Sequence, residues 1–290
     1  MQISEVIDRI KNYHDGKEID PDGNEITEST TRDKVLFGDV HQECTGIVTS
    51  AWASVDVIKQ AIKLGANLII SHEAIFWNHG DHQDWLQSEK NQTYEAKIEL
   101  LASHHIVVWR DHDHIHYGGI PVGGKLVDGI FYGVAQIMGW TDYQINGNGE
   151  RFRDSRYRQF EIPTTTVRTI ADKLIQSGNL NGAKVYGSLD TKVTKVIIPG
   201  HNLGAANDLI SKIDKEDINL VLGMEVIDFT LAEYIRDSSM LGIDRAMVTV
   251  GHFNLEEFGM KYMLNYLPKV IDAGVDWHFV QSGDMYNYVV

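Results

Sequence analysis

The chain has 290 residues, a formal net charge of −15 from 26 basic and 41 acidic side chains, and one cysteine, Cys44. A single cysteine excludes an internal disulfide framework and a cysteine-rich zinc module. An acidic surface repels phosphate backbones, so we expect no nucleic-acid partner. Neither a signal peptide nor an apolar run of about 18 residues is present, which predicts a cytoplasmic protein with no membrane partner.

Short apolar strands alternate with amphipathic helices along the first part of the chain. The helix at 55–64 has clear ends, because Ser54 can cap its start and Gly65 can end it. The elements predicted here are a helix at 4–13, a strand at 46–50, the helix at 55–64, a strand at 67–70, a helix at 94–103 and a strand at 106–109.

The alternation resumes after a glycine-rich segment, 117–124, which we interpret as a linker. The predicted helices that follow cover 127–138, 166–177, 205–213, 229–238 and 255–266, and the strands cover 158–162, 193–199, 220–223, 246–250 and 276–281. This rhythm predicts an α/β fold of two interleaved lobes with mixed sheets covered by helices. Residues 1–125 plus 245–290 are assigned to a metal-binding α/β lobe, and residues 126–244 to a second α/β lobe.

Polar, metal-capable side chains follow three of the predicted strands. His72 and Glu73 follow 67–70, the segment 111–116 follows 106–109, and His252 follows 246–250. Ligands of open α/β sheets bind at the carboxyl ends of strands. We therefore expect a metal site at these strand ends, between the lobes. Imidazole and carboxylate ligands suit zinc, iron and manganese.

Each of these groups also has a purely structural interpretation. His252 and Glu256 are four residues apart and could share one face of a helix. The same pair could be a helix-start histidine and a glutamate that favours the helix dipole. His72 and Glu73 could be a surface pair after a buried strand. His201 lies in a strand-to-helix turn, whose backbone N–H groups could bind an anion.

Several stretches resemble the NGG-one-interacting-factor-three-like proteins, also described as dinuclear metal centre hexameric proteins and as type-two-like GTP cyclohydrolases. The matching stretches are 33–39, 65–76, 111–116 and 251–260. The resemblance implies two divalent metal ions per chain, a small-molecule substrate and a homo-oligomer in the form of a toroidal hexamer. His252 and Glu256 match ligands of the family directly.

Two positions depart from the family's pattern. Where the family has a His-His pair this chain has His72-Glu73, and His116 stands where the family has an aspartate ligand. The implied ligand set is therefore His72, Glu73, His116, His252 and Glu256. This set has three histidines and two carboxylates, the same numbers as the family's set. The alternatives are that one metal position is lost, or that Asp113 replaces the missing aspartate.

The leading functional prediction is a dinuclear metal-dependent hydrolase that uses metal-activated water. The resemblance implies a ring-opening reaction like that of GTP cyclohydrolase, or hydrolysis of another cyclic amide. His112, beside the ligands but off their pattern, is the candidate catalytic residue for proton transfer. The alternatives are a metal-binding regulatory or interaction protein without turnover and, third, an iron-dependent oxidoreductase.

The predicted role of Glu73 as a metal ligand can be tested by substitution. If Glu73 is a ligand, Glu73→Gln and Glu73→Ala should lose one ion per chain while the fold stays intact, because a single carboxylate offsets the repulsion between two cations poorly. Elemental analysis of purified wild type and variants measures this. Unchanged loading with two ions in both variants would remove Glu73 from the site and point to Asp113.

Overall fold

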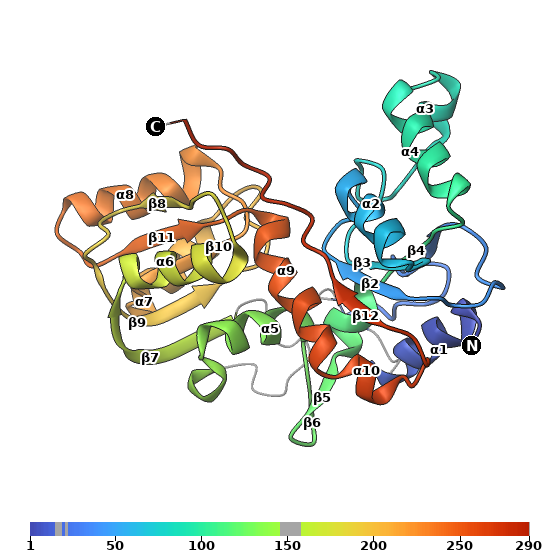
Figure 1. Ribbon diagram of the computed structural model, residues 1–290. Helices are drawn as coiled ribbons and strands as arrows, with labels where there is room; N and C mark the ends of the chain where they lie inside the picture. The colour runs from blue at the N-terminus through green and yellow to red at the C-terminus, as the bar shows by residue number, and fades with distance from the viewer. Residues whose placement is uncertain (15–18, 21–22, 146–157, 290) are drawn as a thin grey trace. The chain divides into compact units, whose positions relative to one another are not determined.

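The computed structural model describes residues 1–14, 19–20, 23–145 and 158–289, and has the predicted mixed α/β architecture (Figure 1). The chain forms two compact units. The first comprises Met1–Ile130 and Gly259–Gly283, and the second comprises Phe131–Phe258 and the segment from Asp284 onward. None of the helices in the described ranges is both long and apolar enough to cross a membrane.

The first unit is organised around a sheet with strand order β1-β4-β3-β2-β12. Its strands are β1 (Val35–Phe37), β2 (Ile47–Ser50), β3 (Leu68–Ser71), β4 (Val107–Arg110) and β12 (Trp277–Phe279). Only the pairing of β1 with β4 is antiparallel within this sheet; β4, β3, β2 and β12 run parallel. The segments that follow β3 and β4 therefore leave the same edge of the sheet.

The helices of this unit are α1 (Ile3–Tyr13), α2 (Val55–Leu64), α3 (Asp84–Ser88), α4 (Gln92–Ser103) and α10 (Leu267–Val270), with a 3₁₀ turn at Met263–Asn265. The side chain of Ser54 accepts the N–H of Val57, and Gly65 adopts a left-handed φ of 72°, so α2 has the predicted ends.

Both faces of the first sheet are buried, as is usual for parallel strands. Side chains alternate between two apolar clusters. Leu68 and Ile70 of β3 pack with α1 and α10 on one face, whereas Ile69 packs with α2 and α4 on the other. This double burial explains why the strands appear in the sequence as short continuous apolar runs.

The second unit has a mixed sheet with strand order β7-β9-β10-β11-β8. Its strands are β7 (Arg158–Thr166), β8 (Lys184–Tyr186), β9 (Lys192–Ile198), β10 (Leu220–Gly223) and β11 (Ala246–Thr249). Strands β9, β10 and β11 are parallel, and β7 and β8 are antiparallel at the edges.

The helices in this part of the chain are α5 (Gly129–Met138), α6 (Val167–Gly178), α7 (Asn207–Glu216), α8 (Glu233–Met240) and α9 (His252–Tyr262), with a 3₁₀ turn at Thr141–Tyr143 and a π turn at Asp228–Ala232. Strand β11 pairs within the second sheet, although the sequence analysis assigned 245–290 to the first lobe. Residues 245–258 accordingly lie in the second unit.

The glycine-rich segment predicted as a linker is instead a hairpin. Strands β5 (Ile120–Val122) and β6 (Lys125–Val127) pair antiparallel around Gly123 and Gly124, which have φ of 57° and 79°. Two consecutive residues of positive φ are what a tight hairpin turn requires, and glycine adopts them without strain. The interpretation as a linker was therefore wrong. Ahead of the hairpin, His114–Gly118 forms a single π-helical turn.

Gly259 is a second position where glycine is required. A Cβ placed on it would lie 2.4 Å from the Cα of Ile130. Gly259→Ala should therefore destabilise the protein by about 1–3 kcal/mol, because the backbone of α9 would be forced away from α5.

Thermal unfolding monitored by circular dichroism measures the effect, with Gly204→Ala as the control. No atom lies within 4 Å of the corresponding Cβ position at Gly204. Equal melting temperatures for the two variants would contradict the close approach.

Candidate metal centre

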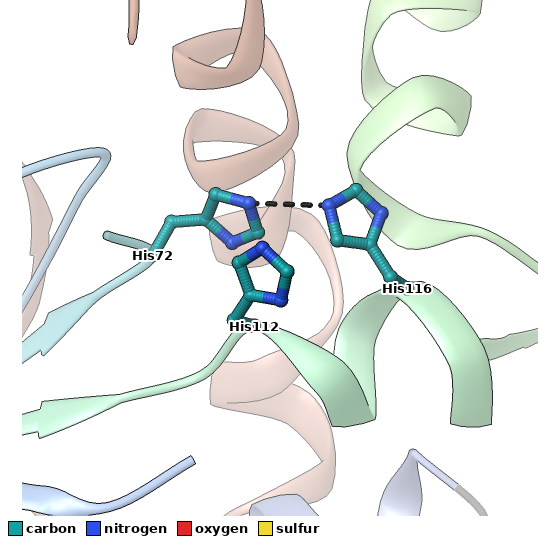
Figure 2. Close-up of side chains that lie close together, drawn as sticks. All are labelled: His72, His112 and His116. Atoms are coloured by element: carbon teal, nitrogen blue, oxygen red, sulfur yellow. Dashed lines mark hydrogen bonds between the residues drawn. The ribbon is translucent and has the colours of Figure 1, made fainter. Parts of the chain in front are cut away.

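Three buried imidazoles meet in the first unit (Figure 2). His72 follows β3, and His112 and His116 follow β4. The Nε2 atoms of His72 and His116 are 3.2 Å apart, and the rings of His72 and His112 stack with centroids 4.8 Å apart. All three side chains are less than a tenth exposed. Their ligand nitrogens lie within 4.8 Å of one another, so the group could hold a metal ion.

Each imidazole of this tri-histidine group directs Nδ1 at an oxygen that can only accept a hydrogen bond. The partners are the Asp111 carbonyl for His72 (3.0 Å), Asp113 Oδ1 for His112 (2.9 Å) and Asp128 Oδ2 for His116 (2.8 Å). With ionised carboxylates, Nδ1 carries the proton and Nε2 keeps its lone pair. Two Nε2 lone pairs then face each other across 3.2 Å, an arrangement that a divalent cation stabilises. The donor set therefore fits a metal ion.

His112, predicted as a catalytic residue beside the ligands, lies in the same group as His72 and His116. Its Nε2 belongs to the tri-histidine group and its Nδ1 is bound to Asp113. Burial lowers the pKa of His112 to about 3, although the hydrogen bond to Asp113 acts in the opposite direction. A neutral imidazole whose Nδ1 is bound to Asp113 suits a metal ligand better than a proton carrier. We therefore treat His112 as a candidate ligand.

Asp113, the alternative replacement for the family's aspartate, faces the other way. It accepts hydrogen bonds from the hydroxyl of Thr31, the backbone N–H of Arg32 and the Arg32 guanidinium, besides His112. Burial raises the pKa of Asp113, but the bonds from His112 and Arg32 outweigh it and hold the pKa well below its usual range. Asp113 is placed to orient His112.

Glu73 lies beside the tri-histidine group and is 6% exposed. Its Oε2 accepts a 2.8 Å hydrogen bond from Nη2 of Arg110, and its Oε1 lies 3.8 Å from Nε2 of His112. Arg110 also donates to the carbonyls of His72 and His79, so it holds the segment after β3 in place. This contact with Arg110 orients one carboxylate oxygen while the other faces His112.

A carboxylate that the sequence analysis did not single out organises the loop after β4. Asp33 accepts the backbone N–H groups of His112 (2.5 Å), Asp113 (2.8 Å) and His114 (2.7 Å), and also contacts the ring of His114. Successive N–H groups aimed at one anion fix a loop conformation. The one available signal was the place of Asp33 at the start of the family-like stretch 33–39.

The second unit contains another group of imidazoles and carboxylates. His252 and Glu256, at the start of α9, approach to 2.9 Å between Nε2 and Oε2. Nδ1 of His252 lies 2.6 Å from Oε1 of Glu225, which Nδ1 of His201 also approaches, at 3.1 Å. A neutral imidazole has one N–H, so His252 can donate to only one of its two carboxylates. The other contact needs a second proton or a metal ion.

The pKa of Glu225 reflects this arrangement. Burial raises it, but the hydrogen bonds from His201 and His252 are stronger together and lower the pKa to about 2. Of the predicted ligands, the structure thus brings His72, Glu73 and His116 together in the first unit. It brings His252 and Glu256 together in the second.

A mixed α/β chain with groups of histidines after its strands has side chains that could bind a metal ion, as in a metal-binding α/β protein. The chain belongs to the Duf34/NIF3 (NGG1p interacting factor 3) family, whose profile matches residues 2–107 and 127–284. The stretch between these matches, 108–126, contains His112 and His116. His116, one of the two departures from the family's pattern, therefore lies where the profile does not match, whereas Glu73, the other, lies within the matched residues.

Individual relatives agree with this assignment. A Staphylococcus aureus protein named GTP cyclohydrolase 1 type 2 homolog is 28% identical over 190 residues, which are 64% of this chain and 46% of that protein. The chain spans about half the length of that relative. A Clostridium acetobutylicum protein of the same name is 21% identical over 225 residues, covering 77% of this chain and 76% of that one.

Solved structures show the same fold. A Staphylococcus aureus hypothetical protein aligns with a TM-score of 0.68 at 16% identity, over 100% of this chain and 99% of that one. A Bacillus cereus protein related to NIF3 aligns with a TM-score of 0.67 at 16% identity, over the same shares of the two chains.

The anchoring role of Asp33 predicts a coupled loss of stability and metal affinity. Asp33→Asn replaces one acceptor oxygen by an amide donor, so at least one buried N–H loses its partner, at a cost of about 1–3 kcal/mol. The loop holding His112 and His116 should loosen, and metal affinity should fall roughly 10–100-fold.

Denaturant unfolding and metal titration measure the two effects. Asp39→Asn is the matched control, because Asp39 is exposed and its carboxylate accepts only the nearby N–H of His41 among the hydrogen bonds found for it in the described chain. A variant Asp33→Asn with unchanged metal affinity would contradict the role.

Proposed function

We propose that this protein is a dinuclear metal-dependent hydrolase of the cytoplasm. The observation that carries the proposal is the set of three buried imidazoles whose Nδ1 atoms all contact oxygens and whose ligand nitrogens lie within 4.8 Å of one another. The proposed ligands are the tri-histidine group with Glu73 in the first unit, and His252 with Glu256 in the second. Together they would serve two divalent ions, of zinc, iron or manganese.

The residues of the chain have separable roles in this proposal. When bound, the ions supply Lewis-acid chemistry that makes hydroxide available near neutral pH. His72, His112 and His116 bind as neutral imidazoles, and Asp113 and Asp128 hold the orientation of two of those rings. These carboxylates accept hydrogen bonds from the imidazoles and so raise their basicity as ligands.

The proposed reaction is hydrolysis of a cyclic amide in a small-molecule substrate, including ring opening of the GTP cyclohydrolase kind. The curated relatives carry the name GTP cyclohydrolase 1 type 2 homolog, which supports this reaction class. The acidic chain makes a nucleic-acid substrate unfavourable. A closed homo-oligomer, in the form of a toroidal hexamer, is part of the proposal.

The test combines metal content with turnover. His116→Ala should lose about one ion per chain and at least about a hundredfold in hydrolytic rate, because removing a ligand costs more than removing its supporting partner. Elemental analysis gives the stoichiometry. Absorbance assays of cyclic amides and GTP with zinc-, iron- or manganese-loaded protein give the rate.

His104→Ala is the control, since His104 is exposed at the end of α4 and hydrogen-bonds locally with Leu100 and Ser103. If metal-loaded wild type hydrolyses none of these substrates while its melting temperature depends on metal, the hydrolase proposal fails. A metal-binding regulatory protein is then the better description.

A further inference from the structure

The second unit contains a small cavity beside Glu225, the residue that binds both His201 and His252. Its volume is about 150 Å³. A cavity of about this size can hold a single six-membered ring such as benzene. Its lining combines aromatic, apolar and charged side chains, mainly Lys184, Met224, Glu225, Thr249, Tyr286 and Tyr288.

The two tyrosines are held in place by close packing on glycine. A Cβ at Gly251 would lie 2.6 Å from Cε2 of Tyr286, and a Cβ at Gly182 would lie 2.8 Å from Cε2 of Tyr288. The carboxylate of Asp284 fixes the start of this segment by accepting the Asn181 N–H at 2.6 Å. The aromatic faces are therefore built into the unit and offer a stacking surface for a planar ring.

The charged groups of the cavity offer a ligand one hydrogen-bond donor and one hydrogen-bond acceptor. The ammonium of Lys184 lies 5.8 Å from the centroid of the Tyr286 ring and can donate a hydrogen bond to a carbonyl or anionic oxygen of a ligand. Oε1 of Glu225 is in hydrogen-bond contact with the imidazoles of His201 and His252. Oε2 is buried and makes no hydrogen bond within the described part of the chain. A buried acceptor without a donor costs free energy, which a ligand N–H would recover.

We propose that this cavity, hereafter the ring site, binds a single planar ring that carries both an N–H donor and a carbonyl or anionic oxygen, as cyclic amides and imides do. The 2.6 Å contact between Glu225 and His252 would place the ring beside a proposed metal ligand. In this respect the inference rests on the proposed function, and it defines the substrate class for that hydrolase.

Hydantoin, a five-membered ring with two N–H groups and two carbonyls, is the probe. We expect saturable binding to the full chain by isothermal titration calorimetry, both after chelation and with zinc bound. 1,3-Dimethylhydantoin, which keeps the ring and carbonyls but has no N–H, should bind at least about tenfold more weakly, because a hydrogen bond to a charged acceptor is lost.

Lys184→Met and Tyr286→Leu should each weaken hydantoin binding about tenfold or more while the melting temperature stays close to wild type. Lys192→Met is the matched control, because Lys192 is an exposed lysine of the same unit outside the ring site, and it should bind as wild type. Glu225→Gln should weaken binding in the metal-free protein too, which separates a contact with the ring from an effect through metal.

Absence of saturable hydantoin binding, or binding that Lys184→Met and Tyr286→Leu leave unchanged, would overturn the ring site. Equal affinity for the dimethylated probe would overturn recognition through N–H. These outcomes are distinct from failure of the hydrolase. Binding without turnover leaves the ring site standing, and hydrolysis of cyclic amides without hydantoin binding leaves the hydrolase and removes the ring site.

Discussion

The buried carboxylate of Asp33 is the constraint on which the histidine loop of the first unit depends. Three successive backbone N–H groups, those of residues 112–114, point at it. Because those N–H groups are committed to one anion, the chain leaves β4 in a single conformation and turns at once into the π turn of His114–Gly118. His112 and His116 therefore reach the same point as His72, which comes from the neighbouring strand β3.

Burial of so many ionisable groups has an electrostatic consequence. Asp33, Asp111, Asp113 and Asp128 are all at most 5% exposed, and the main fixed cations in contact with this region are Arg32 and Arg110. A buried carboxylate is costly unless hydrogen bonds or opposite charges stabilise it, and here backbone N–H groups, imidazoles and Arg32 are among the groups that do so. Divalent ions at the tri-histidine group would offset the negative charge, and the same charge would raise the affinity for them.

The two departures from the family's pattern have a common physical meaning. Glu73 stands where the family has a histidine, and Arg110 binds one of its oxygens, so its charge is partly compensated before any ion arrives. His116 stands where the family has an aspartate, and Asp128 takes the proton of its Nδ1. The proposed exchange would move a carboxylate from one position to another, and each of the two residues has a partner suited to it.

Local sequence determined the α/β alternation, because strands that are buried on both faces have continuous apolar sequences. The ends of α2 were also determined locally, by Ser54 and Gly65. The candidate metal-binding residues were also visible, since imidazoles and carboxylates directly follow the ends of β3, β4 and β11. Periodicity did not reveal the hairpin at 120–127, whose turn glycines resemble a linker, or the pairing of β11 with the second sheet. The stacking of His112 on His72, the anchoring by Asp33 and the link from Glu225 to His252 join residues that are far apart in the chain. Only tertiary packing decides these, because a hydrogen bond requires two atoms to meet within about 3 Å, and spacing along the sequence does not specify that.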